Sequence, residues 1–168
     1  MTRAPLADKK AVVTEKPEKR WRTRLFHFYF RLARPMTLGV RGIVLDADGR
    51  VFLVRHTYVP GWHLPGGGVE AGETLARALA KELREEGNIV ARSPPELFGM
   101  YFNGHVSRRD HVAVFVVRDF EQTGPRPPDR EIAESGFFAL DALPATVTRG
   151  TRARLEEALG GAPRSETW

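Results

Sequence analysis

The most informative part of the chain is GGVEAGETLARALAKELREEGNI, residues 67–89. It opens on glycines and continues into Thr74 to Glu86, a segment without Gly or Pro that predicts a helix. Leucines recur every four residues on one line of that helix, at Leu75, Leu79 and Leu83. Gly87-Asn88 suits a left-handed cap, so the helix is expected to end there.

Three carboxylates share one side of this helix. Glu82, Glu85 and Glu86 stand at positions i, i+3 and i+4. Glu86 also falls about 20° from Leu79 around the helix axis, which places it beside the apolar line. Like charges at this spacing repel, and a carboxylate near a buried face needs compensation. A hard divalent cation such as Mg²⁺ would compensate both, whereas the alternative is a solvated glutamate-rich helix.

Consecutive glycines stand immediately before this segment, at Gly66, Gly67 and Gly68. They allow a tight loop and a close approach of the backbone to another group. Exposed amides or carbonyls in such a loop contact metals or phosphates. The loop and the carboxylates together favour a site for a metal ion and a phosphate-containing ligand.

The spacing of these residues resembles the Nudix box, the motif of a family of hydrolases that act on nucleoside diphosphates linked to another group. The matching positions are Gly67, Glu73, Lys81-Glu82-Leu83, Glu85-Glu86 and Ile89. The flanking segments 64–70 and 137–144 also look like those of the family, so the resemblance covers roughly Thr37 to Leu159. It implies a fold of the α/β class, an α/β/α sandwich with a mixed sheet. It further implies hydrolysis of a pyrophosphate bond in a nucleotide or nucleotide-sugar type of small-molecule substrate.

By the same resemblance the cofactor is Mg²⁺, with Mn²⁺ as the alternative. The implied metal ligands are the carboxylates of Glu82, Glu85 and Glu86 and the carbonyl of Gly67. A bound divalent metal neutralises the diphosphate and lowers the pKa of a bound water that attacks phosphorus.

The reaction also needs a general base. Glu82 is one choice, and Glu85 stands on the same side of the predicted helix. Glu131 and Glu134 stand where the family often places such a carboxylate, and the alternative is that they are ordinary loop acids.

Two positions depart from the box. Lys81 stands in place of arginine and Asn88 in place of glycine. The resemblance implies that the residue at position 81 pairs with Glu73 and so holds the loop against the helix. Lysine keeps the positive charge of arginine but loses its bidentate geometry. Asn88 still tolerates a left-handed conformation.

The rest of the chain is expected to form one domain with extensions. A hairpin is predicted from strands 38–45 and 51–54 around the turn 46–49, with further strands at 96–101, 112–117 and 136–140 and a last helix at about 148–159. The expected divisions are a disordered basic tail at 1–20, an amphipathic helix at 21–35, the Nudix domain at 36–160 and a loose C-terminal tail at 161–168.

Charge and composition narrow the class of protein. The net charge is +5, but residues 1–35 contain ten Lys/Arg against three acids, a net +7, which leaves −2 for the other 133 residues. A DNA-binding face on the domain is therefore not expected. Without cysteine or an apolar run long enough to span a bilayer, the chain is expected to be cytoplasmic, with no stable membrane insertion.

Several features keep alternatives open. The aromatic face of the helix at 21–35 is expected to pack on its own domain, join a homodimer or lie on an anionic membrane surface. Arg41 and Arg55 either face phosphates or are solvated strand charges, and Trp62 and Tyr101 either stack a base or pack in the core. The rival functions are a Nudix-fold ligand sensor without turnover and an RNA-processing member of the family.

Overall fold

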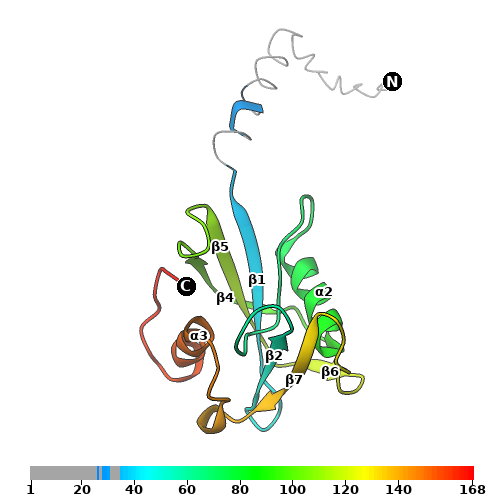
Figure 1. Ribbon diagram of the computed structural model, residues 1–168. Coiled ribbons are helices and arrows are strands. Elements are labelled where there is room, and N and C mark those ends of the chain that lie inside the picture. The colour runs from blue at the N-terminus through cyan, green and yellow to red at the C-terminus, as the bar shows by residue number, and fades with distance from the viewer. Residues whose placement is uncertain (1–25, 27, 31–34) are drawn as a thin grey trace, which may run out of the picture. The chain divides into compact units, whose positions relative to one another are not determined.

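The computed structural model describes residues 26, 28–30 and 35–168, and Figure 1 shows the order of its elements. The chain divides into two units, residues 1–35 and 36–168. In the first unit, residues 26 and 28–30 are helical and residue 35 is not, while the basic tail and the other residues of the predicted N-terminal helix lie outside the described residues. None of the helices in the described part is long and apolar enough to cross a membrane.

The second unit is built on a mixed three-stranded sheet. Its centre is β5 (Asp110–Val117), which pairs in parallel with β1 (Thr37–Val44) and antiparallel with β4 (Glu96–Phe102). Two further antiparallel pairs are β2 (Val51–His56) with β7 (Ile132–Phe138), and β3 (Ile89–Ala91) with β6 (Phe120–Gln122).

The predicted hairpin is wrong in its pairing, although both of its strands exist. Only Leu45 and Val51 form a bridge between the two segments, while β1 pairs with β5 and β2 with β7. The turn between them forms as expected, since Gly49 has φ 74° and donates its N–H to the carbonyl of Asp46. The turn therefore redirects the chain from one strand pair to another.

Both predicted helices of the domain are present with capped ends. In α2 (Leu75–Gly87), the side chain of Thr74 accepts from the N–H of Arg77, and Asn88 closes the helix at φ 53°. In α3 (Arg149–Leu159), the side chain of Thr148 accepts from the N–H of Thr151. A short 3₁₀ helix, η1 (Leu140–Ala142), lies between β7 and α3. These side-chain caps satisfy N–H groups that have no partner inside a helix.

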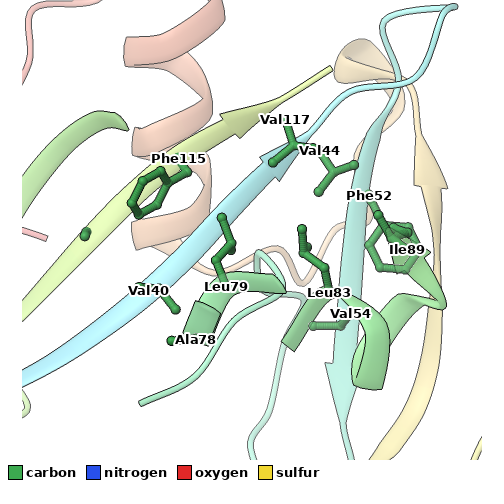
Figure 2. Packing of buried hydrophobic residues seen from close by; sticks show 11 residues of the cluster. Val40, Val44, Phe52, Val54, Ala78, Leu79, Leu83, Ile89, Phe115 and Val117 are labelled. Atoms are coloured by element: carbon green, nitrogen blue, oxygen red, sulfur yellow. The ribbon is translucent and has the colours of Figure 1, made fainter. Parts of the chain in front are cut away.

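The two faces of β1, β2 and β5 contribute to two separate cores, and each core is covered by a different helix. Alternate residues of β1 contribute Val40 and Val44 to the core under α2, and Ile43 to the core beside α3. The core under α2 is shown in Figure 2, and it contains Val40, Val44, Phe52, Val54, Ala78, Leu79, Leu83, Ile89, Ala113, Phe115 and Val117. The other core includes Ile43, Leu53, Leu64, Val114 and, from α3, Leu155. Figure 1 places α2 and α3 on opposite sides of the strands, which confirms the α/β/α arrangement.

The tail predicted to be loose is packed against the domain at its far end. Phe102 donates its N–H to the carbonyl of Glu166 at 2.9 Å, and Trp168 donates to the carbonyl of Phe102 at 3.0 Å. Arg154 donates to the carbonyl of Thr167 at 2.9 Å. Residues 165–168 therefore cover part of β4, because the edge of that strand offers unpaired backbone groups.

Candidate active site

The glycine-rich loop lies along β1 and is fixed by backbone hydrogen bonds. Val40 donates to the carbonyl of Gly67 at 2.9 Å, and Gly42 donates to that of Pro65 at 2.9 Å. Gly66 has φ 142°, and a Cβ at that position would lie 2.0 Å from the carbonyl oxygen of Val40. Only glycine fits there, so the glycine run serves the close contact between loop and strand.

Glu86 lies at the inner end of the site and is only 4% exposed. Its Oε2 accepts the N–H of Gly66 at 2.7 Å, and its Oε1 lies 3.5 Å from Nε2 of His56. Burial raises the pKa of Glu86 to about 8, against the lowering effects of the Gly66 hydrogen bond and of Arg41. The expected position of this carboxylate beside the apolar line of α2 is confirmed, and ionising it requires compensation.

Glu82 lies one helical turn earlier, next to the loop. A Cβ on Gly67 would lie 2.5 Å from Oε1 of Glu82, so the absence of a side chain at 67 leaves room for this carboxylate. Burial raises the pKa of Glu82, Lys81 lowers it, and the negative charge of Glu85 raises it further. The two inward-facing carboxylates of α2 are therefore both in surroundings that disfavour their charge.

Arg41 supplies a positive charge from β1 between the loop and the two glutamates. Its Nη1 donates to the carbonyl of Leu64 at 3.1 Å and to that of Gly66. Burial lowers the pKa of Arg41, while Glu86 and Glu82 raise it. An arginine stays protonated in proteins, so this side chain is a fixed cation in the site.

These groups surround a pocket of about 300 Å³. Its lining is formed by Arg41, His56, Tyr58, Val59, His63, Gly66, Gly67, Gly68, Glu82, Glu86 and Glu131. The pocket thus combines acidic oxygens with the side-chain donors of arginine, histidine and tyrosine. Such a set suits a ligand that carries both a metal ion and phosphate oxygens.

The structure brings together four of the residues proposed from the sequence, Gly67, Glu82, Glu86 and Glu131. Glu85 is exposed on α2 and does not line the pocket, although its charge acts on Glu82. Glu134 lies outside the pocket, where its Oε2 accepts from Nη2 of Arg55 at 2.9 Å. Of the two candidate loop carboxylates, only Glu131 faces the site.

Glu73 and Lys81 contact other residues rather than each other. Oε2 of Glu73 accepts the N–H of Glu70 at 3.1 Å, which closes the turn before α2. Nζ of Lys81 lies 3.8 Å from Oε1 of Glu82. Each residue therefore supports the loop–helix junction through a neighbour of its own.

The sequence offers little signal for three further pocket residues. His56, Tyr58 and His63 also line the pocket. Burial lowers the pKa of both His56 and His63. Their one sequence signal is position, since they flank the segment that leads into the glycine loop. Of the two arginines, Arg41 points into the site and Arg55 pairs with Glu134 outside it.

The oxygen donors of this pocket fit a hard divalent cation whose other ligands are waters and substrate oxygens. No group of three or more His, Cys, Asp or Glu side chains among the described residues forms a ready-made metal centre. Glu82, Glu86 and the carbonyl of Gly67 nevertheless place three oxygen donors around one pocket. Mg²⁺ typically takes one or two carboxylates and completes its shell with waters and phosphates.

Comparison with known proteins places this site in a family. The family model described as "NUDIX domain" matches residues 35–158. An ADP-ribose pyrophosphatase from Methanocaldococcus jannaschii is 30% identical over 118 residues, 68% of this chain and 69% of the relative. A MutT-like protein from Streptomyces ambofaciens is 31% identical over 126 residues, 75% of this chain and 79% of the relative.

A solved structure has the same fold. The MutT NUDIX hydrolase from Burkholderia pseudomallei superposes with a TM-score of 0.62 at 28% identity, covering 71% of this chain and 95% of that one. The matched region holds the glycine loop, α2 and the pocket-lining carboxylates, and the family model spans well over half of the sequence. This protein therefore belongs to the NUDIX family of pyrophosphohydrolases.

Proposed function

We propose that the protein is a Mg²⁺-dependent hydrolase that cleaves the pyrophosphate bond of a nucleoside diphosphate linked to another moiety. The observation that carries the proposal is the pocket in which Glu82, Glu86 and Glu131 face Arg41 beside the glycine loop. The acidic residues suit metal ions, and the arginine suits the phosphate oxygens that such ions bridge.

The metal would be held by Glu82, Glu86 and the carbonyl of Gly67, with Glu85 beside Glu82 at the rim. When bound, it supplies an activated water and neutralises the diphosphate. The raised pKa values of Glu82 and Glu86 support this assignment, because a nearby cation would offset the cost of burying their charges. The carbonyl of Gly67 accepts one backbone N–H, which leaves a second lone pair available.

Glu131 is proposed as the general base. It is on the pocket wall, and Tyr58 Oη lies 3.5 Å from its Oε1. Its carboxylate accepts a proton from the attacking water, and Glu82 remains the alternative for this role. Arg41 binds loop carbonyls through Nη1 and presents its charge to phosphate oxygens in the same pocket.

The substrate class follows from the family and from one relative. The relative from Methanocaldococcus jannaschii is named an ADP-ribose pyrophosphatase, so ADP-ribose belongs among the substrates tested. A ligand sensor without turnover is disfavoured because Glu82, Glu85 and Glu86 are all retained. An RNA-processing role would rely on the basic segment 1–35, since the remaining residues carry −2.

The proposal is tested by a screen of ADP-ribose, nucleoside diphosphate sugars, dinucleoside polyphosphates and nucleoside triphosphates, with chromatographic detection of the nucleoside monophosphate product as the readout. We expect no turnover after chelation and full recovery with Mg²⁺ or Mn²⁺. Glu85→Gln and Glu86→Gln should each lower kcat/KM by about 100-fold or more while the circular dichroism spectrum is unchanged. Turnover that persists in chelator, or in both variants, would contradict the proposal.

A further inference from the structure

A second and larger hollow adjoins the catalytic pocket. Its volume is about 740 Å³, which lies in the range of small-molecule binding sites. It is bordered by the beginning of α3 and by residues 165–168, and it shares His63 with the catalytic pocket. Its lining includes Thr148, Arg149 and Gly150 of the helix start and Ser165, Thr167 and Trp168 of the C-terminal segment.

Backbone pairing joins the walls of the two hollows. His63 exchanges hydrogen bonds with Val54 of β2, at 2.8 and 2.9 Å. The preceding residue, Trp62, donates to the carbonyl of Thr146 at 3.0 Å and accepts from the N–H of Thr148 at 3.1 Å. The segment that supplies His63 is thus tied to the N-terminal cap of α3. A ligand with its diphosphate in the first pocket can therefore reach the second by passing His63.

One wall of the second hollow is an aromatic ring in a fixed position. The backbone of Trp168 donates to Phe102, and the adjacent Thr167 accepts from Arg154. The guanidinium of Arg154 lies 3.9 Å from the ring centroid of Tyr101 and 5.6 Å from that of Trp168. The absence of a side chain at Gly150 leaves room for the ring, since a Cβ there would lie 2.3 Å from Nε1 of Trp168. The indole is held before any ligand arrives, which reduces the entropy lost on binding.

We propose that this second pocket binds the nucleoside part of the substrate, with Trp168 as the surface on which the base packs. This inference rests on the proposed function, because one molecule would occupy both pockets. Every base has a π-face that can pack on an indole. The hydroxyls of Ser165 and Thr167 bond to each other at 3.2 Å and keep further hydrogen-bonding capacity for ribose hydroxyls and base edges, and Arg149 adds a cation at the rim.

Two substitutions test the role of the indole in different ways. Trp168→Ala removes the ring, whereas Gly150→Ala displaces it and adds a residue that favours helix. Arg152→Ala, on the exposed side of the same helix, is the matched control. We expect both test variants to raise KM for the nucleotide substrate about tenfold with kcat nearly unchanged, and the control to match the wild type. An alkyl diphosphate without a nucleoside should show no such change in KM.

A binding measurement keeps this inference separate from catalysis. The four nucleoside 5′-monophosphates are titrated into the chelator-treated protein, and tryptophan fluorescence is followed. At least one nucleotide should change the emission of the wild type and of Arg152→Ala, and the change should be much smaller in Trp168→Phe, where only Trp21 and Trp62 remain. An unchanged KM in both test variants, or a fluorescence response in Trp168→Phe as large as that of the wild type, would overturn the inference even if hydrolysis is confirmed. A fluorescence response without turnover on any substrate would support the pocket and contradict the proposed function.

Discussion

Glu131 and Glu134 are three residues apart in the sequence but lie in different surroundings in the structure. Glu134 lies in β7 opposite Arg55 and pairs with it at the surface. Glu131 precedes the strand in a loop fixed by Asp129, whose Oδ1 accepts the N–H groups of Glu131 at 2.9 Å and Ile132 at 2.8 Å. The Ile132 hydrogen bond, followed by those of Arg126 and Glu131, lowers the pKa of Asp129 to about 2, so its carboxylate holds the loop over the whole physiological range.

The two glutamates form a matched pair for testing the general base. Glu131→Gln should lower kcat by about 100-fold or more, because the pocket loses its proton acceptor. Glu134→Gln should stay within about twofold of the wild type, since an exposed ion pair contributes little. Steady-state kinetics at saturating Mg²⁺ provides the comparison. Equal losses in the two variants would remove Glu131 from the proposed role.

The buried carboxyl group of Glu86 should make the stability of the metal-free protein depend on pH. Its carboxyl group stays protonated in the folded chain up to a pH of about 8, whereas the reference pKa is 4.5. Between these values the folded state binds more protons than the unfolded state, so the contribution of Glu86 to stability decreases as the pH rises. The limiting slope is about 1.4 kcal/mol per pH unit.

This effect is measured by urea unfolding in chelator at several pH values between 4.5 and 8. The difference in unfolding free energy between Glu86→Gln and the wild type should grow in favour of the variant as the pH rises. Burial also lowers the pKa values of His56 and His63, so protonation of these histidines adds a pH dependence of its own to both proteins. A pH-independent difference would show that Glu86 ionises normally.

At the scale of the elements, α2 serves the core and the site at once. Leu79 and Leu83 are fully buried against β1, while Glu82 and Glu86 reach the pocket. The helix packs closely because Gly42 of β1 has no side chain, and a Cβ there would lie 3.2 Å from Leu79 and 3.3 Å from Leu83. The position of the two carboxylates is therefore set by core packing as well as by their own contacts.

The basic residue before Glu82 should tune the metal site more than it tunes the stability of α2. Lys81 is partly exposed, and its charge lowers the pKa of Glu82. Lys81→Ala should weaken Mg²⁺ binding about threefold to tenfold with the melting temperature nearly unchanged, and Lys81→Arg should be neutral or improve activity. Mn²⁺ binding followed by electron paramagnetic resonance gives the affinities.

A parallel Glu73→Gln variant separates the two possible partners of Lys81. If Lys81 acts through Glu82, as the 3.8 Å contact indicates, Glu73→Gln should not reproduce the loss of metal affinity. Matching losses in the two single variants, with no further loss in the double variant, would instead establish the pair implied by the family pattern. Unchanged metal affinity in Lys81→Ala would mean that neither contact matters.

At the scale of the whole molecule, the domain contains both cores without the N-terminal unit. The clusters under α2 and beside α3 use residues from Val40 onward. The described aromatic residues of the first unit, Phe26, Phe28 and Tyr29, are largely exposed. Apolar surface of this kind normally marks a contact with another surface.

Deletion of residues 1–34 tests what that unit contributes. We expect the remaining chain to keep its metal-dependent turnover, since the pocket is formed entirely by residues 41–131. It should melt at a lower temperature or aggregate, because the aromatic segment is expected to cover apolar surface on the domain or in a dimer. Differential scanning calorimetry and sedimentation measure both properties. An equally stable and soluble truncation, with the full chain binding anionic vesicles in a salt-sensitive manner, would favour a membrane contact instead.

The sequence by itself determined the features that depend on neighbouring residues. The caps at Thr74 and Asn88, the turn ending at Gly49 and the inward position of Glu86 all follow from local conformational preference and helical spacing. Only the tertiary structure decided that β1 pairs with β5 instead of β2, that Glu131 rather than Glu134 faces the pocket, and that residues 165–168 pack on β4. These outcomes join residues far apart in the chain, and the energy of a backbone pair is nearly independent of which strand supplies the partner. The strand pairing is therefore decided by which arrangement packs the two cores best, and no local sequence pattern encodes that packing.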